Sequence, residues 1–281
     1  MKLGVHSAIF VKDWEEDITP YIHRCHEAGY NCIEVSLLGQ DEYSSEKIGH
    51  LSDKLNIEIT CTTGLSHDED ITSENISKRE VGIKALERAI DLTSRMNSSI
   101  LSGVVFAPWG ISDSKGLDKD KKYLNSSKSI QSVCNSLEIK KINLAIEPLN
   151  RYETDFLNTV DEGLYLCEII NHDRVGLLLD SYHMNIEEKN PTNSIKKANE
   201  KIFHFHVAEN DRGIPGSGSI NWEKTFNTLY AINYSKCVTL EMFTQAFVNT
   251  SKDLFTWRNI ELDPFEAIVK AHKFLKKYIH D

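Results

Sequence analysis

Eight short apolar segments alternate with helix-like segments along the whole chain of 281 residues. Most are continuous apolar runs, which is typical of strands in a parallel sheet covered on both faces. The predicted strands are residues 3–6, 32–36, 58–62, 100–105, 143–147, 176–180, 202–207 and 237–241. Eight strands and eight helices in alternation indicate an α/β fold, a (β/α)8 TIM barrel that occupies residues 1–281 as a single domain, since such barrels commonly use ~250 residues. A doubly wound open sheet is the alternative.

The helical segments carry signals of their own. Within residues 73–96, side chains recurring at three and four positions predict one buried stripe of Val81, Ala85, Leu86, Ala89, Ile90, Thr93 and Met96. The last helix is predicted to start at Asp263 as N-cap, with Pro264 in its first turn and Glu266 three residues after the cap. Its predicted core face is Phe265, Ile268, Val269, Phe274 or Leu275, and Tyr278. The lysine-rich run 115–122 is predicted to be a solvated loop or the start of the fourth helix.

Composition narrows the class of protein. A hydrophobic content of 40% with 26% charged residues is typical of a soluble globular protein, and the net charge of −10 argues against nucleic-acid or anionic-membrane partners. The six cysteines show no CxxC spacing, which predicts free thiols in a reducing compartment. The N-terminal apolar run is too short for a signal peptide, and no stretch approaches the ~18 apolar residues of a membrane span. A cytoplasmic location is therefore expected.

Four of the predicted strands end in side chains that bind metals. Glu147, Asp180 and Glu241 each follow an apolar run, and His206 lies near the end of the seventh strand, on the same face as His204. The ends of successive barrel strands converge, so these four donors are expected to meet at the C-terminal face, where active sites of such barrels lie. Three carboxylates in one place would raise one another's pKa unless a cation offset their repulsion. This donor set suits Mn²⁺ or Mg²⁺, with Co²⁺ or Zn²⁺ as alternatives, whereas His204 is expected to lie deeper in the core.

The stretches EPLNRYE, LDSYHMNIEE, HFHVAENDRGIPGSG and LEMF extend this pattern over residues 142–243. They resemble the xylose-isomerase-like sugar epimerase and isomerase barrels, particularly the ketose 3-epimerases of the tagatose and psicose type. A weaker, collinear resemblance runs through the MKLG start, CTTGL at 61–65 and FAPW at 106–109.

The resemblance implies one divalent metal ion, most typically Mn²⁺ with Co²⁺ or Mg²⁺ as alternatives, bound by Glu147, Asp180, His206 and Glu241, and no organic cofactor. It also implies that Glu147 and Glu241 act as the paired acid and base. The substrate contacts that it implies are Glu153, His183, Arg212, Trp109, Cys61 and His6. The partners expected on this basis are a small-molecule sugar, with neither nucleic acid nor membrane, and further copies of the chain in a homodimer or homotetramer.

Structural interpretations stay open for some of these residues. Arg212 lies in the glycine-rich loop 211–218 and has Asp211 and Glu209 as alternative salt-bridge partners. Cys61 is equally typical of an inert buried thiol. Three aromatic residues are either an apolar wall against a sugar ring or ordinary core packing: Phe10, Trp14 and Trp109.

The chemistry follows from the residue types. A hydrogen beside a ketone is weakly acidic, and two carboxylates on opposite sides of a bound sugar can remove that proton from one face and return one to the other, through a cis-enediolate. Together with the resemblance, which implies the ketose substrate and its C3 position, this chemistry makes a ketose 3-epimerase the expected function. The alternatives are a related epimerase or aldose–ketose isomerase acting on a keto-glycoside, a sugar phosphate or a cyclitol, since the GIPGSG loop is shared with such relatives. A metal-dependent nuclease and an inactive sugar-binding barrel are the other classes considered.

Overall fold

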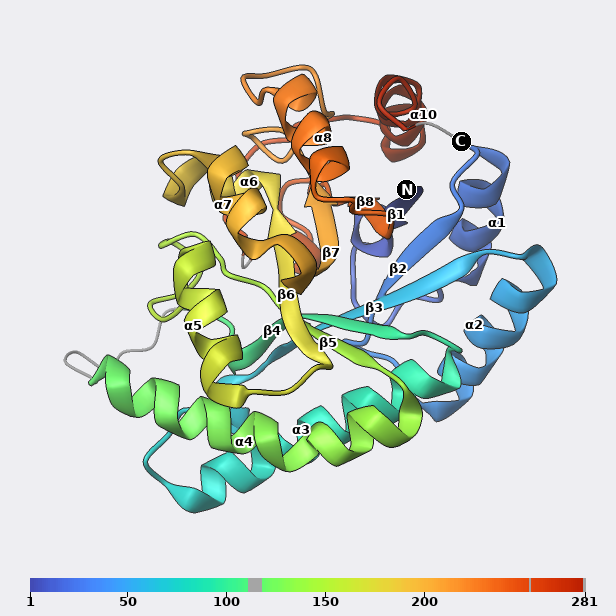
Figure 1. Ribbon diagram of the computed structural model, residues 1–281. Coiled ribbons are helices and arrows are strands. Elements are labelled where there is room, and N and C mark those ends of the chain that lie inside the picture. The colour runs from blue at the N-terminus through green and yellow to red at the C-terminus, as the bar shows by residue number, and fades with distance from the viewer. Residues whose placement is uncertain (111–117, 253, 280–281) are drawn as a thin grey trace.

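The computed structural model describes residues 1–110, 118–252 and 254–279. Eight parallel strands form a closed barrel in chain order, and β8 pairs with β1 to complete it (Figure 1). The strands are β1 (Lys2–His6), β2 (Cys32–Ser36), β3 (Glu58–Leu65), β4 (Ile100–Pro108), β5 (Asn143–Ile146), β6 (Val175–Asp180), β7 (Ile202–Val207) and β8 (Cys237–Leu240). The predicted TIM barrel is confirmed, and the open sheet is excluded.

Strand bounds differ from the prediction mainly at β3 and β4, which each extend three residues further. These two strands continue to pair beyond a register shift at Gly64/Leu65, so that Leu65 lies opposite Pro108. Strands β5 and β8 end one residue earlier than predicted. Glu147 and Glu241 therefore lie directly after their strands, on the loop side of the barrel end.

Helices surround the barrel (Figure 1). They are α1 (Thr19–Glu27), α2 (Glu42–Leu55), α3 (Ile76–Arg95), α4 (Lys119–Lys140), α5 (Val160–Ile170), α6 (Ser181–Glu187), α7 (Pro191–Ala198), α8 (Trp222–Ala231), α9 (Asn249–Lys252) and α10 (Pro264–Leu275). Short 3-10 turns form at η1 (Ser7–Ile9), η2 (His67–Glu69) and η3 (Asn199–Lys201). The expectation of eight helices is wrong, because β6 is followed by two helices, α6 and α7, and β8 by α9 and α10.

The helix ends agree better with prediction than the helix faces do. Asp263 caps α10 by accepting hydrogen bonds from the backbone of Phe265 and Glu266. Val81 and Val269, predicted to be buried, are 49% and 54% exposed. Each lies one position, about 100° around the helix, from a residue of the buried face. Those faces comprise Gly82, Leu86, Ala89, Ile90, Leu92 and Thr93 in α3 and Ala267, Ile268, Ala271 and Leu275 in α10. The lysine-rich run was predicted to be a loop or the start of the fourth helix. Its residues from Lys119 onward belong to α4, and residues 115–117 lie outside the described residues.

The barrel interior contains a small apolar cluster near the N-terminal ends of its strands. Its members are Ile100, Ala145, Leu178 and Phe203. Two residues further along β4 and β6, on the same inward face, Ser102 and Asp180 are buried polar groups. This layering places the polar groups at the C-terminal end of the strands.

All six cysteines are buried free thiols, as predicted. In the described part of the chain, none of the helices combines the length and the apolar character that crossing a bilayer requires.

Candidate metal centre and its cavity

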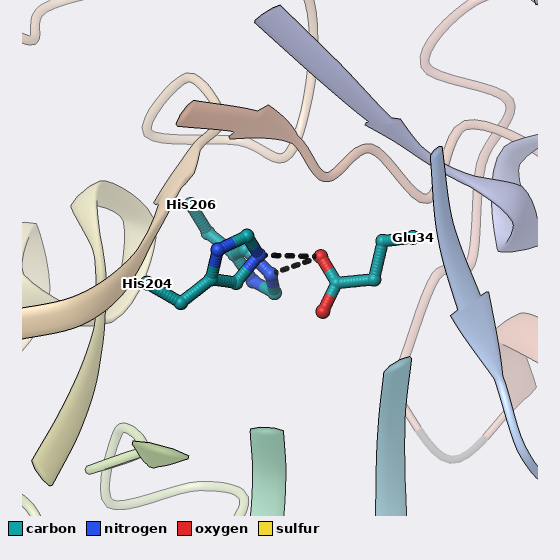
Figure 2. A group of neighbouring side chains, drawn as sticks. All are labelled: Glu34, His204 and His206. Carbon is teal, nitrogen blue, oxygen red and sulfur yellow. Dashed lines mark hydrogen bonds and ion pairs between the residues drawn. The ribbon is translucent and has the colours of Figure 1, made fainter. Parts of the chain in front are cut away.

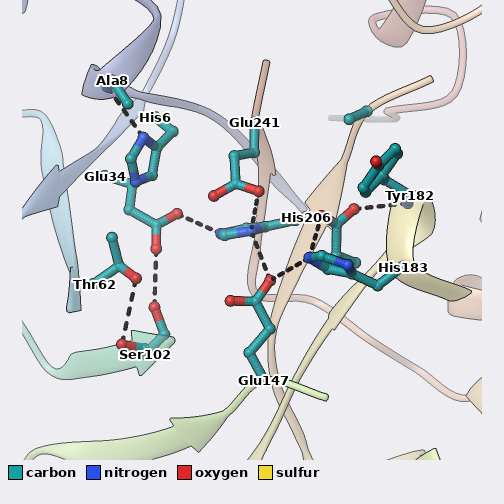
Figure 3. Close-up of polar contacts among 12 residues, drawn as sticks. His6, Ala8, Glu34, Thr62, Ser102, Glu147, Tyr182, His183, His206 and Glu241 are labelled. Carbon is teal, nitrogen blue, oxygen red and sulfur yellow. Dashed lines mark hydrogen bonds and ion pairs between the residues drawn. The ribbon is translucent and has the colours of Figure 1, made fainter. Parts of the chain in front are cut away.

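The four predicted metal ligands meet at the C-terminal end of the barrel. Glu147 follows β5, Asp180 ends β6, His206 lies in β7 and Glu241 follows β8. One donor atom from each lies within 4.8 Å of those of the other three, and all four side chains are buried. Figure 3 shows Glu147 and Glu241 converging on the His206 ring. Four donors from strands far apart in sequence therefore form one cluster that can hold a divalent cation.

Two atoms of this cluster are buried without a hydrogen-bond partner among residues 1–110, 118–252 and 254–279. They are Oε1 of Glu147 and Nδ1 of His206, which lie 3.7 Å apart. The same Nδ1 lies 3.4 Å from Oε2 of Glu241. A buried polar atom without a partner is costly, and a cation bound between these atoms would remove that cost. Carboxylate oxygens with one imidazole nitrogen also match the ligand preference of divalent metals such as Mn²⁺.

Without a cation, burial and neighbouring charges shift the pKa values of the carboxyl groups in the cluster. Burial, with the neighbouring Glu241, raises the pKa of Glu147 well above its usual value. Burial also raises the pKa of Asp180 to about 6. Burial opposes ionisation of Glu241 too, but His206 and Arg212 hold the pKa of this carboxyl well below its usual value. Added positive charge at this point would favour the ionised form of every carboxyl group in the cluster.

Metal binding is expected to weaken in acid. Asp180, whose pKa is raised from 3.8 to about 6, is protonated below that pH and must release its proton before it binds a cation. Affinity for Mn²⁺ should therefore fall by about tenfold or more for each unit of pH below 6. It should keep rising above pH 6, because, although burial opposes its charge, Glu34 and Glu241 raise the pKa of His206 well above its usual value, and this ligand must also release a proton. Calorimetric titration at pH 5, 6 and 7.5 measures this change. Equal affinities at pH 5 and 7.5 would contradict the assignment of Asp180 as a ligand.

Arg212 joins the cluster from the loop that follows β7. Its Nη1 donates to Oδ2 of Asp180 at 2.8 Å and to Oε2 of Glu241. Its Nη2 lies 3.1 Å from Nε2 of His183 and 3.8 Å from Glu153. Although burial disfavours its charge, Glu241 and Asp180 raise the pKa of Arg212 above its usual value. These partners belong to the cavity, so the alternative of a salt bridge with Asp211 or Glu209 within the loop is wrong.

His183 and Glu153 are held by one residue that the sequence did not indicate, Asn150. Its backbone N–H donates to Nδ1 of His183 at 3.0 Å, and its side-chain amide donates to Oε1 of Glu153 at 2.8 Å. Burial lowers the pKa of His183 well below its usual value, so the ring is neutral. Because Nδ1 accepts the Asn150 N–H, the ring proton of neutral His183 is on Nε2, which lies 3.8 Å from Oε1 of Glu147 and from Oδ2 of Asp180. Asn150 belongs to the EPLNRYE stretch. The resemblance of that stretch to the family was the one sequence feature that could have indicated a role for Asn150.

A cavity opens onto the cluster at this end of the barrel. The predicted contacts that line it are His6, Trp109, Glu153, His183 and Arg212, together with Trp14. Cys61 is not among the lining residues, because its thiol points to Sδ of Met96 at 3.6 Å, on the helix side of the sheet. Its neighbours Thr62 and Gly64 line the cavity instead. Phe10 stacks on Tyr21 and Phe265 rather than lining the cavity.

Two further carboxylates support the site in ways that the sequence analysis did not predict, Glu34 and Glu209. Glu34, fully buried in β2, contacts both His204 and His206 (Figure 2). Glu209 accepts hydrogen bonds from the backbone of Gly216 and Ile220 and from the Trp222 indole. These three bonds tie the two ends of the loop that carries Arg212 to each other. The signal for Glu34 was a carboxylate inside an apolar strand, a position that is costly unless the charge is paired.

Comparisons with known proteins agree with this geometry. Residues 22–278 match the model of the xylose isomerase-like TIM barrel family. The chain is 30% identical to D-psicose 3-epimerase of Agrobacterium fabrum, over 92% of this chain and 91% of that protein. It is also 30% identical to L-ribulose 3-epimerase of a Methylomonas species, over 99% and 97%. A crystal structure of D-psicose 3-epimerase in the presence of D-fructose superposes with a TM-score of 0.94 at 27% identity, covering 99% of both chains.

Proposed function

Since the chain belongs to the xylose isomerase-like TIM barrel family, we propose that it is a divalent-metal-dependent epimerase that inverts the carbon next to the carbonyl of a free ketose, a ketose 3-epimerase. The names of its relatives support this reaction, because two proteins of nearly full-length similarity are 3-epimerases of ketoses. The single observation that carries the proposal is the pair Glu147 and Glu241, both facing one cavity beside the cluster of metal-binding donors.

The two glutamates supply the acid and the base. One removes the proton from the carbon beside the ketone, and the other returns a proton to the opposite face, so that the stereocentre is inverted without any redox cofactor. Each such group contributes about 10²–10⁴-fold in rate. Glu147 and Glu241 follow strands β5 and β8, which are not neighbours in the closed barrel. This separation supports placing them on two sides of one substrate.

The remaining polar residues hold the sugar. The Nε2–H of His183 and the guanidinium of Arg212 are donors for the carbonyl and hydroxyl oxygens, and Glu153 is an acceptor for a hydroxyl group. Fixed donors of this kind orient the substrate and stabilise the charge that develops on its oxygens. Glu147, Asp180, His206 and Glu241 would hold the metal ion, with Mn²⁺ proposed, and its chemistry is to stabilise the negative charge of the enediolate as a Lewis acid.

The lining of the cavity favours a free sugar over a sugar phosphate. Among the described residues that line it, Arg212 is the only Lys or Arg, and this guanidinium already faces Asp180 and Glu241. A phosphate needs unshared cationic groups or several backbone N–H groups. Trp14, Trp109 and Phe243 offer instead the aromatic faces on which a sugar ring packs. A nuclease is also disfavoured, because contacts to a nucleic-acid backbone need a basic groove and Arg212 is the only Lys or Arg among the described residues that line this cavity.

Solvent deuterium provides the test of this function. In D₂O with Mn²⁺, psicose, tagatose and ribulose are expected to acquire deuterium at C3 while their C3 epimers appear, because the returned proton comes from a carboxyl group that exchanges with solvent. Phosphorylated and glycosidic ketoses serve as comparison substrates under the same conditions. Proton NMR measures both the exchange and the inversion. Turnover confined to the phosphorylated or glycosidic compounds, or inversion without deuterium, would contradict the proposal.

The proposal extends to assembly and location. A homodimer or homotetramer is supported by large apolar side chains exposed after β8, namely Phe247, Phe255, Trp257 and Leu262, which are 53–87% exposed. A cytoplasmic location is supported by the six thiols, which are all free.

A further inference from the structure

A hydrogen-bonded group lies behind His206, on the side of the ring away from the cavity. Nδ1 of His206 faces Glu147 and Glu241, whereas Nε2 of the same ring lies 2.7 Å from Oε2 of Glu34. Nε2 of His204 lies 2.9 Å from the same oxygen (Figure 2). Glu34 therefore joins two histidines of β7 from strand β2 on the other side of the barrel interior.

This group of three is a hydrogen-bonded arrangement and not a second metal site. Two donors bound to one metal at about 2.0–2.1 Å in tetrahedral geometry lie roughly 3.3 Å apart. The contacts of Glu34 are 2.7 and 2.9 Å, which are ordinary hydrogen-bond lengths. The other oxygen of Glu34 accepts a hydrogen bond from Ser102 at 2.9 Å. Both carboxylate oxygens are thus already satisfied by donors (Figure 3).

The protons of this group can be assigned from the bonding rules. An ionised carboxylate only accepts hydrogen bonds, so His204 and His206 must each donate an Nε2–H to Glu34. In the neutral form that metal binding requires, His206 keeps its proton on Nε2 and has its lone pair on Nδ1. That atom is the one that faces the two glutamates and has no hydrogen-bond partner. Glu34 therefore fixes the tautomer that a metal ligand needs.

We propose that Glu34 is a positioning residue for the metal centre: by accepting the Nε2–H of His206, it orients the ring, keeps the Nδ1 lone pair directed at the cation and adds a negative charge one ring away. This inference rests on the proposed function, because it presupposes that His206 binds the metal.

The surroundings of Glu34 suit this role. The carboxylate is fully buried, and the partners recorded for it in the described residues are Ser102, His204 and His206, with no Lys or Arg among them. Its charge is therefore shared with the His206 ring and not cancelled by a neighbouring cationic group. Carboxylates that bind the outer nitrogen of a metal-ligating histidine typically contribute 10–100-fold in metal affinity, which sets the expected size of the effect.

Two substitutions separate charge from position. Glu34→Gln keeps the shape and one acceptor oxygen but removes the charge, and Glu34→Leu removes both. Titration of the metal-free protein with Mn²⁺ is expected to give an affinity about 10-fold weaker for Gln and about 100-fold weaker for Leu. The nitrogen-15 shifts of His206, recorded with Mg²⁺ as a diamagnetic cation, should show the Nε2–H tautomer in the unchanged protein and a mixture of tautomers in Glu34→Leu.

Thr60→Val is the matched control. Thr60 is fully buried, pairs with Glu34 across β2 and β3 and faces the same barrel interior, and its hydroxyl oxygen lies 3.8 Å from Sγ of Cys32. Its replacement is expected to change stability without changing Mn²⁺ affinity. Unchanged affinity and tautomer in both Glu34 variants would overturn the inference while leaving the proposed function intact. Failure of the unchanged protein to bind Mn²⁺ would instead overturn the proposed function. Equal weakening by Thr60→Val would reduce Glu34 to a general structural role and overturn the inference.

Discussion

Replacing Glu147 with Gln, or Glu241 with Gln, is expected to lower epimerisation of the ketose by about 10²–10⁴-fold, because each variant lacks one of the two groups that move the proton. Proton exchange with solvent should survive in part. The remaining glutamate can still remove and return the proton on its own face, so each variant should incorporate deuterium into one epimer without inverting it. The two variants should retain exchange with opposite epimers.

Proton NMR in D₂O, with each epimer offered separately, measures both rates. Because both glutamates are also expected to bind the metal, the comparison is made at saturating Mn²⁺ with the bound metal measured for each variant. Glu138→Gln serves as the control, since this carboxylate is half-exposed and pairs with Arg174 outside the cavity. Exchange of the same epimer by both variants would show that one group moves both protons, and full activity in either would remove that residue from the mechanism.

The barrel and its four converging donors were predictable because each leaves a local mark in the sequence. Asp180 ends an uninterrupted apolar strand, and Glu147 precedes a proline that stops one, so both break the pattern at the place where strand ends converge. The cap of α10 was predictable for the same reason, since Asp263 and Pro264 act on their immediate neighbours. Features fixed by adjacent residues can be read from one chain.

Features fixed by distant residues could not be read in this way. Glu34 and His204 are 170 positions apart, and their contact exists only because the barrel closes. The position of Cys61 depends on which face of β3 points inward, and the resemblance that suggested a substrate contact does not determine that face. The second helix between β6 and β7 was predictable from adjacent residues, because Asn190 and Pro191 form a typical helix start. It was not predicted because one helix per strand was assumed.

Arg212 links the electrostatics of the cavity to the stability of the fold, and replacing it with Met is the second change with a large expected effect. The guanidinium is buried and donates to Asp180 and Glu241. Removing one partner of a buried charge pair typically costs 3–5 kcal/mol, because the other charge is left without compensation. The metal-free Arg212→Met variant should lose about that much free energy of unfolding at pH 8.

The loss should be smaller in acid. Burial raises the pKa of Asp180 to about 6 even with Arg212 beside it, and without that positive charge the pKa rises further. At pH 5 this carboxyl is therefore protonated in the folded variant and carries no charge that needs a partner. A raised pKa in the folded state lowers stability as the pH increases through it, so the difference between variant and unchanged protein should grow from pH 5 to pH 8.

Saturating Mn²⁺ should restore much of the lost stability in Arg212→Met, because a cation held by Asp180 and Glu241 supplies the positive charge that the guanidinium provided. Turnover should stay low, since the donor for the substrate oxygen is still missing and such donors are worth about 10²–10³-fold. Urea unfolding at both pH values, with and without Mn²⁺, measures the first effect, and Arg212→Lys, which keeps the charge, is the matched control. A variant that the cation does not stabilise would mean that Arg212 and the metal do not share these carboxylates.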